Sequence, residues 1–89
     1  MGYHVKILPQ AQRDIAFYKN TGKIASFKKV KKLILELRDH PTTGTGQPEK
    51  LKYNLAGYWS RRIDKKNRLI YRIEDNKVIV VVVSALGHY

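Results

Sequence analysis

The sequence contains no cysteine, so a disulfide framework, a thiolate metal site and a catalytic thiol are all excluded. It is also poor in metal-binding side chains, because its 3 histidines and 7 acidic residues are scattered without ligand spacing. We therefore expect no metal and no cofactor. The longest apolar run, at 78–83, is far too short to span a bilayer. Together with the lack of an N-terminal leader pattern, this predicts a soluble, cytoplasmic protein with no membrane partner.

Positive charge is abundant. The chain has 18 Lys plus Arg against 7 Asp plus Glu, a formal net charge of +11 and a pI near 10.1. Such a balance favours nucleic acid as a partner, although an acidic protein or an anionic lipid would satisfy the same arithmetic. With 89 residues, 43% of them hydrophobic, the chain is predicted to form one small domain over residues 1–89.

Residues 57–73 form two alternating runs joined by a polar turn, which predicts a β-hairpin. With the turn near Lys65, one face carries the apolar residues Trp59, Ile63, Leu69, Tyr71 and Ile73. On the other face, Arg62 and Arg68 become cross-strand neighbours. Like charges in that position cost a few tenths to about 1 kcal/mol, which a bound polyanion would offset. The alternative interpretation is that these arginines are ordinary solvated surface.

Two helices are predicted after a short strand at 3–8. Pro9 suits the first turn of a helix, and apolar residues then recur at helical spacing until Gly22. A second helix starts near Lys23 and stops before Pro41. Its apolar stripe consists of Ile24, Phe27, Val30, Ile34 and Leu37. The following segment, 41–48, matches no phosphate-binding motif despite its two glycines, and we interpret it as a flexible connection.

The C-terminal half is predicted to be strands. Residues 49–55 alternate as a short strand or extended segment, and the β-branched run at 78–83 indicates a central strand buried on both faces. One strand, two helices and then three or four strands predict an α+β domain. The two helices should pack on one face of a mostly antiparallel twisted sheet, in the order β-α-α-β-β-β(-β).

The few reactive side chains are consistent with metal-free RNA cleavage. That reaction needs a base for the 2′-hydroxyl, cations for the charged phosphorane and an acid for the departing 5′-oxygen. The candidates are Glu49 as base, Arg62 and Arg68 as phosphate clamps, and His88 as acid, with Tyr89 as an alternative donor. Each also has an ordinary interpretation: Glu49 as a surface acid after a loop, and His88 as a frayed residue near the chain end.

A longer pattern extends over most of the chain. It consists of Pro41, Gly44, Gly46, residues 48–52 (PEKLK), 54–55 (NL), Gly57, 59–63 (WSRRI), 68–71 (RLIY) and 88–89 (HY). This pattern resembles the Txe/YoeB family of toxins in the RelE-like superfamily. Proteins of that family are ribosome-dependent messenger-RNA interferases of type II toxin–antitoxin modules, and a cognate antitoxin neutralises them.

The resemblance implies cleavage of messenger RNA in the A site of the ribosome (30S/70S), leaving a cyclic 2′,3′-phosphate and a 5′-hydroxyl. It implies a cognate antitoxin as partner, a homodimer as a common state, and operator DNA bound only through the toxin–antitoxin complex. The competing hypothesis is a non-catalytic basic protein that binds RNA or the ribosome and blocks translation. A DNA-binding regulator is disfavoured because no recognition element is evident.

The resemblance also assigns residues. The family's general base falls on Glu49, its transition-state arginines on Arg62 and Arg68, and its general acid on His88. Tyr89 and Lys52 fall on supporting positions of the family. We further expect basic side chains around this site to bind RNA, namely Lys50, Lys52, Arg61, Lys65 and Lys66.

The chain departs from the family pattern at three positions. Asn67 replaces a frequent histidine, and Thr42 and Thr43 replace a common aromatic. These departures bear on finer substrate contacts and antitoxin docking. Codon preference, the identity of the antitoxin, the oligomeric state and the choice between His88 and Tyr89 as main donor are left open by the sequence.

Overall fold

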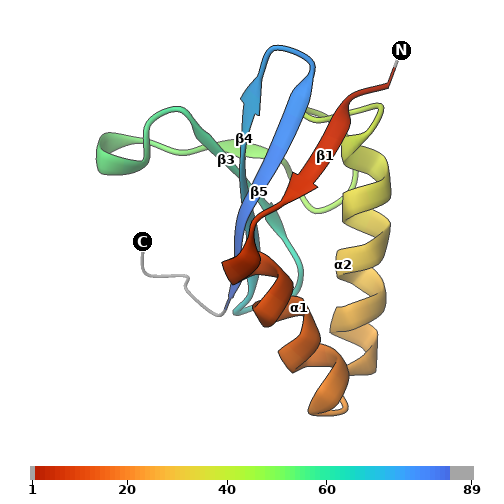
Figure 1. Cartoon of the computed structure of the whole chain (residues 1–89). Coiled ribbons are helices and arrows are strands. Elements are labelled where there is room, and N and C mark those ends of the chain that lie inside the picture. Colours follow the sequence, from red (N-terminus) through yellow and green to blue (C-terminus); the bar gives the residue numbers. More distant parts are fainter. Residues whose placement is uncertain (1, 85–89) are drawn as a thin grey trace.

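The computed structural model describes residues 2–84 of the chain (Figure 1). Its elements, in order, are β1 (His4–Ile7), α1 (Pro9–Asn20), α2 (Ile24–Leu37), β2 (Glu49–Lys50), the 3₁₀ helix η1 (Tyr53–Leu55), β3 (Tyr58–Arg62), β4 (Arg68–Glu74) and β5 (Lys77–Ser84). The strands form one sheet in the order β1-β5-β4-β3-β2. β1 is parallel to β5, and the other neighbours are antiparallel. The predicted α+β fold, with two helices packed against the sheet, is confirmed.

The helices form where the sequence predicts them. Pro9 occupies the first turn of α1, where its missing N–H costs nothing, and α1 buries Ala11 and Tyr18. α2 buries a stripe that includes Leu33, which the predicted stripe omitted, whereas Ile24 at its start is 47% exposed. Neither helix is long and apolar enough to cross a membrane, within the part of the chain that the structure describes.

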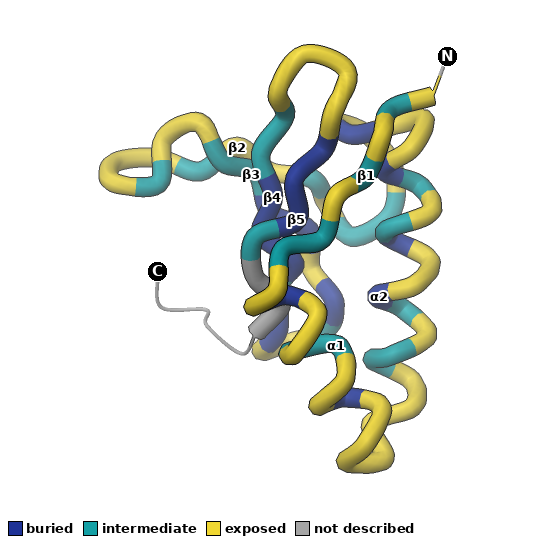
Figure 2. Tube along the Cα trace, viewed as in Figure 1, coloured by how far each residue is buried: buried dark blue, intermediate teal, exposed yellow. Residues whose placement is uncertain are grey.

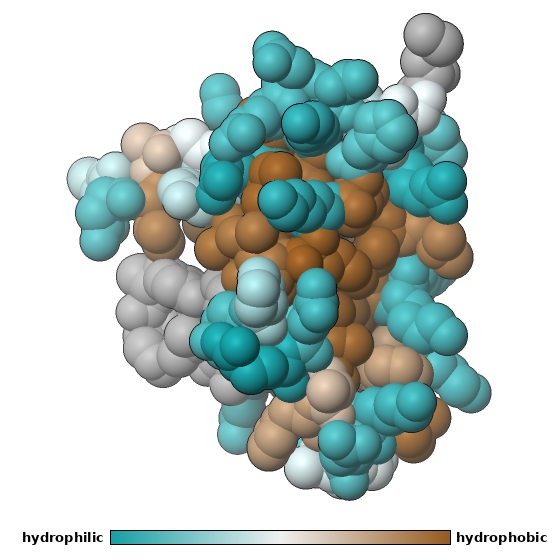
Figure 3. Space-filling model, in the orientation of Figure 1, coloured by the Kyte–Doolittle hydropathy of each residue, from teal (hydrophilic) through white to brown (hydrophobic). Residues whose placement is uncertain are grey.

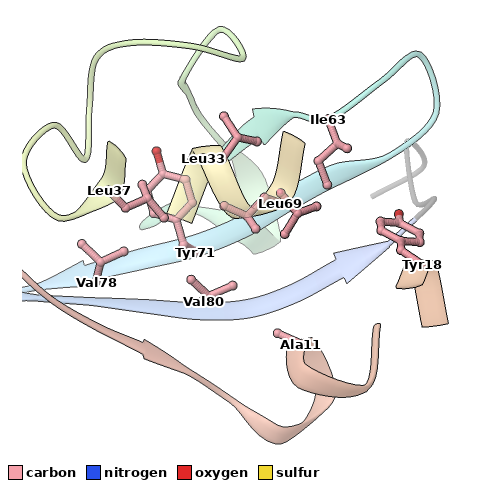
Figure 4. Packing of buried hydrophobic residues seen from close by; sticks show 10 residues of the cluster. Ala11, Tyr18, Leu33, Leu37, Ile63, Leu69, Tyr71, Val78 and Val80 are labelled. Carbon is pink, nitrogen blue, oxygen red and sulfur yellow. The ribbon is translucent and has the colours of Figure 1, made fainter. Parts of the chain in front are cut away.

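One apolar core lies between the helices and the sheet (Figure 4). Its buried members are Ala11, Tyr18, Val30, Leu33, Leu37, Ile63, Leu69, Tyr71, Val78 and Val80. Figure 2 shows the buried positions concentrated along β4 and β5 and on one side of α2, with the turns exposed. This core lies on the helix-covered face of the sheet. The other face, called the open face below, carries Arg62 and Arg68 but also includes the buried residues Ser60 and Ile70.

The register of the β3–β4 hairpin is the predicted one. Trp59 lies opposite Tyr71 on the helix-covered face, and Arg62 lies opposite Arg68 on the other face. β5 is an interior strand between β1 and β4, as its β-branched run indicates. A bulge interrupts its pairing with β4 beside Ile70 and Tyr71.

The segment 49–55 is less regular than a continuous strand. Only Glu49 and Lys50 pair with β3, and the chain then turns through η1, with Tyr53 at a positive φ of 60°. The predicted extended segment is thus limited to a two-residue edge strand. Such a short edge strand needs other contacts to hold it in place.

Candidate active site

The open face of the sheet brings three of the predicted catalytic residues together. Glu49 on β2 lies opposite Ser60 on β3, and Arg62 at the end of β3 lies opposite Arg68 at the start of β4. Because directly paired residues share a face, all four side chains belong to the same side of the sheet. The local cause is the alternation of β3, which sends Ser60 and Arg62 away from the core.

Arg68 is the centre of this group. Its Nη1 lies 3.2 Å from Ser60 Oγ, to which it donates a hydrogen bond, and 3.5 Å from Glu49 Oε1. The Arg68 side chain is 28% exposed and that of Glu49 is 63% exposed, so the ion pair is weak and accessible. Among the described residues, Arg62 has no hydrogen-bond or ion-pair partner for its exposed side chain. Arg68 therefore contacts one loosely held carboxylate, and Arg62 lies directly across the strand pair from Arg68.

A shallow apolar groove of about 470 Å³ also includes residues of the open face. It lies between the start of α1, η1 and the strands, and its lining consists of Leu8, Pro9, Gln10, Leu55, Tyr58, Ile70 and Val81. Figure 3 shows apolar side chains gathered over the strands in the middle of the view, with hydrophilic side chains at the β4–β5 turn. The open face thus carries both cationic and apolar surface.

The remaining predicted residues have different outcomes. Lys52, Lys65 and Lys66 are exposed, Lys52 just before η1 and the other two in the β3–β4 turn. Lys50 is exposed but pairs with Trp59, so it lies on the opposite side of the sheet edge from Glu49. His88 and Tyr89 lie outside the described residues.

Arg61 corrects the expectation that it binds RNA. It lies on β3 between Trp59 and Ile63, on the helix-covered face, and it is 0% exposed. Its guanidinium donates to Glu36 Oε1 at 2.9 Å, Thr45 O at 3.2 Å, Thr43 O at 2.7 Å, Tyr71 Oη at 3.3 Å and His40 O. A side chain enclosed in this way has no surface left for a phosphate, so Arg61 has a structural role in the chain.

The interpretation of 41–48 as a flexible connection is also wrong, because this loop is packed against the rest of the domain. The Thr45 amide donates to Glu36 Oε1 at 2.9 Å, and the Arg62 amide donates to Gly46 O at 2.6 Å. Gly46 has φ 85°, and a Cβ there would lie 2.8 Å from Arg62 O. Its glycine is therefore required by close packing and a left-handed backbone, not by phosphate binding. Hydrogen bonds from Thr45 lower the pKa of Glu36 against the opposing effect of burial, and Arg61 lowers it further.

The β3–β4 turn is held by one carboxylate. Asp64 accepts hydrogen bonds from the Lys66 and Asn67 amides, from Asn67 Nδ2 and from Ser26 Oγ on α2, at 2.7–2.9 Å. Asn67 is buried, so this departure from the family pattern serves the turn that precedes Arg68. Burial alone would raise the pKa of Asp64, but these hydrogen bonds outweigh it and lower the pKa from 3.8 to about 2.

This arrangement predicts an acid-labile turn. A lowered folded-state pKa means that ionised Asp64 stabilises the fold above the unfolded pKa of 3.8, and that the contribution is lost as the pH falls toward 2. At 1.36 kcal/mol per unit, the contribution is about 2 kcal/mol. The stability gap between wild type and Asp64→Asn, measured by urea unfolding, should shrink by that amount from pH 6 to pH 2. Ser26→Ala, which removes one donor, should show a smaller change, and a pH-independent gap for Asp64→Asn would contradict the assignment.

Residues 8–89 match the family model described as the YoeB-like toxin of the bacterial type II toxin-antitoxin system. The chain belongs to the YoeB toxin family. It is 40% identical over 67 residues to Toxin YoeB of Escherichia coli K12, covering 75% of this chain and 79% of the relative. The YoeB dimer from Staphylococcus aureus superposes with a TM-score of 0.81 at 34% identity over 100% of both chains. The YoeB-YefM complex from the same organism gives 0.79 at 34% identity, again over 100% of both chains. This YoeB-family chain is therefore a toxin of a type II toxin–antitoxin system.

Two features of this YoeB-family site were missed at the sequence level. Ser60 positions Arg68, and the alternation that placed both on one face was the available signal. The Arg61–Glu36 pair had no local signal, since the partners are 25 residues apart. No cluster of His, Asp or Glu that could hold a metal ion occurs among the described side chains. What the arrangement offers chemically is an exposed carboxylate in contact with one arginine, with a second arginine directly across the strand pair.

Proposed function

We propose that the chain is a ribosome-dependent endoribonuclease that cleaves messenger RNA in the ribosomal A site and so inhibits translation. The observation that carries the proposal is the position of Glu49 Oε1 3.5 Å from Arg68 Nη1, with Arg62 directly across the sheet from Arg68. Placing two like charges opposite each other costs stability. A phosphate bound between them would offset that repulsion, so the pair of arginines is suited to binding the RNA backbone.

In the proposed reaction, Glu49 takes the proton of a ribose 2′-hydroxyl, and the resulting oxygen attacks the adjacent phosphorus. Arg62 and Arg68 stabilise the extra negative charge on the phosphorane, because guanidinium groups donate paired hydrogen bonds to phosphate oxygens and stay charged. The bond to the 5′-oxygen then breaks, and an acid supplies the proton that this oxygen needs. The products are a cyclic 2′,3′-phosphate and a 5′-hydroxyl end.

We assign the acid role to His88, with Tyr89 in support. Ser84, the last residue of β5, pairs with Arg68, and His88 follows four residues later. Four residues span at most about 14 Å, so covalent geometry allows His88 to reach the arginines. His88→Gln should retain the fold and lose cleavage by roughly 10²- to 10⁴-fold, measured as single-turnover cleavage on programmed ribosomes. Activity within a few-fold of wild type would transfer the role to Tyr89, to be checked with Tyr89→Phe.

Lys52, Lys65 and Lys66 are proposed to bind the RNA backbone from the rim of the site, with Lys50 contributing from the other side of the sheet edge. For partners, we propose a cognate antitoxin and a homodimer, in line with the complexes formed by the Staphylococcus aureus relative. The net charge of +11 suits an acidic antitoxin segment. Operator DNA is proposed to bind only through the toxin–antitoxin complex, and the cytoplasm, where ribosomes translate, is the proposed site of action.

Primer extension on ribosome-bound transcripts tests the central proposal. The toxin should generate new ends within the A-site codon, and the same transcript without ribosomes should remain intact. Translation arrest with intact messenger on the ribosome would instead support a non-catalytic inhibitor and reject the nuclease. Because the assay maps ends at nucleotide resolution, it also reports codon preference.

A further inference from the structure

The buried Arg61 side chain holds the segment that leads into Glu49. Its five N–H groups meet five acceptors, which are the carbonyls of His40, Thr43 and Thr45, the carboxylate of Glu36 and the hydroxyl of Tyr71. Three of these acceptors are backbone groups of one irregular segment, 40–45. A guanidinium is the one side chain with five donors in a rigid plane, so Arg61 is matched to this loop in number and in geometry.

The same loop is tied at further points around Arg61. Tyr71 Oη donates to Pro41 O at 2.6 Å, and Glu36 accepts from the Thr45 amide. Figure 4 shows Tyr71 on β4 beside Leu37, on the helix-covered side of the sheet. The chain from 40 to 46 is therefore fixed to the end of α2, to β3 and to β4 at once.

β2 depends on the hydrogen bonds that Arg61 makes to the loop 40–46, because β2 itself has few contacts that fix its position. It comprises only Glu49 and Lys50 at the sheet edge, and the segment before it has no regular structure. Its register nevertheless decides which face Glu49 occupies, since a slip by one residue would send the carboxylate to the other side of the sheet. Only two residues, Gln47 and Pro48, separate Glu49 from Gly46, whose carbonyl accepts a hydrogen bond from the Arg62 amide.

We propose that Arg61 is a positioning residue for the proposed general base: by fixing the loop 40–46 it sets the register of β2 and holds Glu49 beside Arg68. The inference rests on the proposed function of Glu49. The two neighbouring arginines then have different roles on opposite faces of the sheet. Arg62 contacts the RNA, and Arg61 holds the loop that leads to the base. Misplacing a catalytic group by about 1 Å can cost roughly 10²-fold in rate, so the anchor acts on turnover more than on binding.

Arg61→Lys tests the proposal. A lysine keeps the charge but offers three donors from one atom, so two acceptors of the loop lose their partner. Single-turnover cleavage on saturating programmed ribosomes should fall about 10- to 100-fold, while the half-saturating ribosome concentration changes by less than about threefold. Cleavage within about twofold of wild type would overturn the proposal.

Amide hydrogen exchange provides a readout that does not require activity. The amides of Thr45 and Leu51, bonded to Glu36 Oε1 and to Tyr58 O, should lose protection in Arg61→Lys, while amides of the β4–β5 ladder stay protected. Unchanged protection of both amides would overturn the anchoring role even if wild type does not cleave RNA. An inactive wild type with the expected exchange would instead reject the proposed function alone.

Two further variants keep the test decisive. Val80→Ala truncates a buried core residue on β5, outside the loop 40–46. It should keep both the cleavage rate and the protection of the Leu51 amide, even where it lowers the free energy of unfolding as much as Arg61→Lys does. If Arg61→Lys does not fold, Glu36→Leu takes its place, because it retains the guanidinium and its three carbonyl partners but removes the acceptor that Arg61 and the Thr45 amide share. Glu36→Leu should cleave more slowly and lose protection at Leu51, and wild-type values for both would overturn the proposal.

Discussion

Glu49→Gln is expected to abolish codon cleavage, with a loss of roughly 10²- to 10⁴-fold, because an amide cannot accept the 2′-hydroxyl proton. The fold should be unaffected. The Glu49 side chain is 63% exposed and lies 3.5 Å from Arg68 Nη1, and such exposed pairs contribute at most about 1 kcal/mol. The measurement is single-turnover cleavage on programmed ribosomes, paired with urea unfolding of the same preparation.

The chain provides a matched control for this change. Glu74 is also an exposed glutamate paired with an arginine, since its Oε2 lies 2.5 Å from Arg72 Nε, but it lies at the far end of β4 from Arg68. Glu74→Gln removes the same charge and should cleave at the wild-type rate. Equal losses in both variants would mean that net charge, rather than a base at Glu49, controls the activity.

Arg62→Met is expected to change activity and stability in opposite directions. Cleavage should fall about 10²- to 10³-fold, as is typical when a group that stabilises transition-state charge is removed. The free energy of unfolding should rise by a few tenths to about 1 kcal/mol, because the substitution removes a like charge lying directly opposite Arg68. A side chain retained at a cost to the fold is retained for binding or chemistry.

Arg13→Met is the corresponding control. Arg13 is an exposed arginine of α1 whose Nη2 donates to Gln10 Oε1 at 3.0 Å. Its loss lowers the net charge equally but relieves no cross-strand repulsion, so neither the rise in stability nor the loss of cleavage is expected. If Arg62→Met destabilised the chain, or if both variants lost cleavage alike, the clamp assignment would be wrong.

Much of the candidate site could be predicted because it depends on local periodicity. Alternation along 57–73 fixed the register of the hairpin, and the structure places Arg62 opposite Arg68 as that register requires. The same alternation places Arg61 on the buried face, yet its charge suggested an RNA contact. A buried arginine is stable only if hydrogen-bond acceptors surround it. The acceptors of Arg61 come mainly from a loop whose path no local sequence pattern specifies, so the sequence does not indicate that Arg61 is enclosed.

The structure of the loop 41–48 likewise could not be predicted from local sequence. Its composition is that of a flexible connection, and only the structure shows that Gly46 lies against β3 and that Glu36 captures Thr45. The two-residue length of β2 and the bulge in β5 were likewise not predicted. Each depends on contacts between segments distant in the chain.

The sequence by itself therefore determined the order of helices and strands and the two faces of the hairpin. These follow from side-chain periods of 2 and 3.6, which act within a single element. The tertiary structure decided that β1 pairs in parallel with β5, that Arg61 is enclosed and that Glu49 lies beside Arg68. These outcomes depend on which distant backbone and polar groups satisfy one another, a condition that exists only once the whole chain has packed.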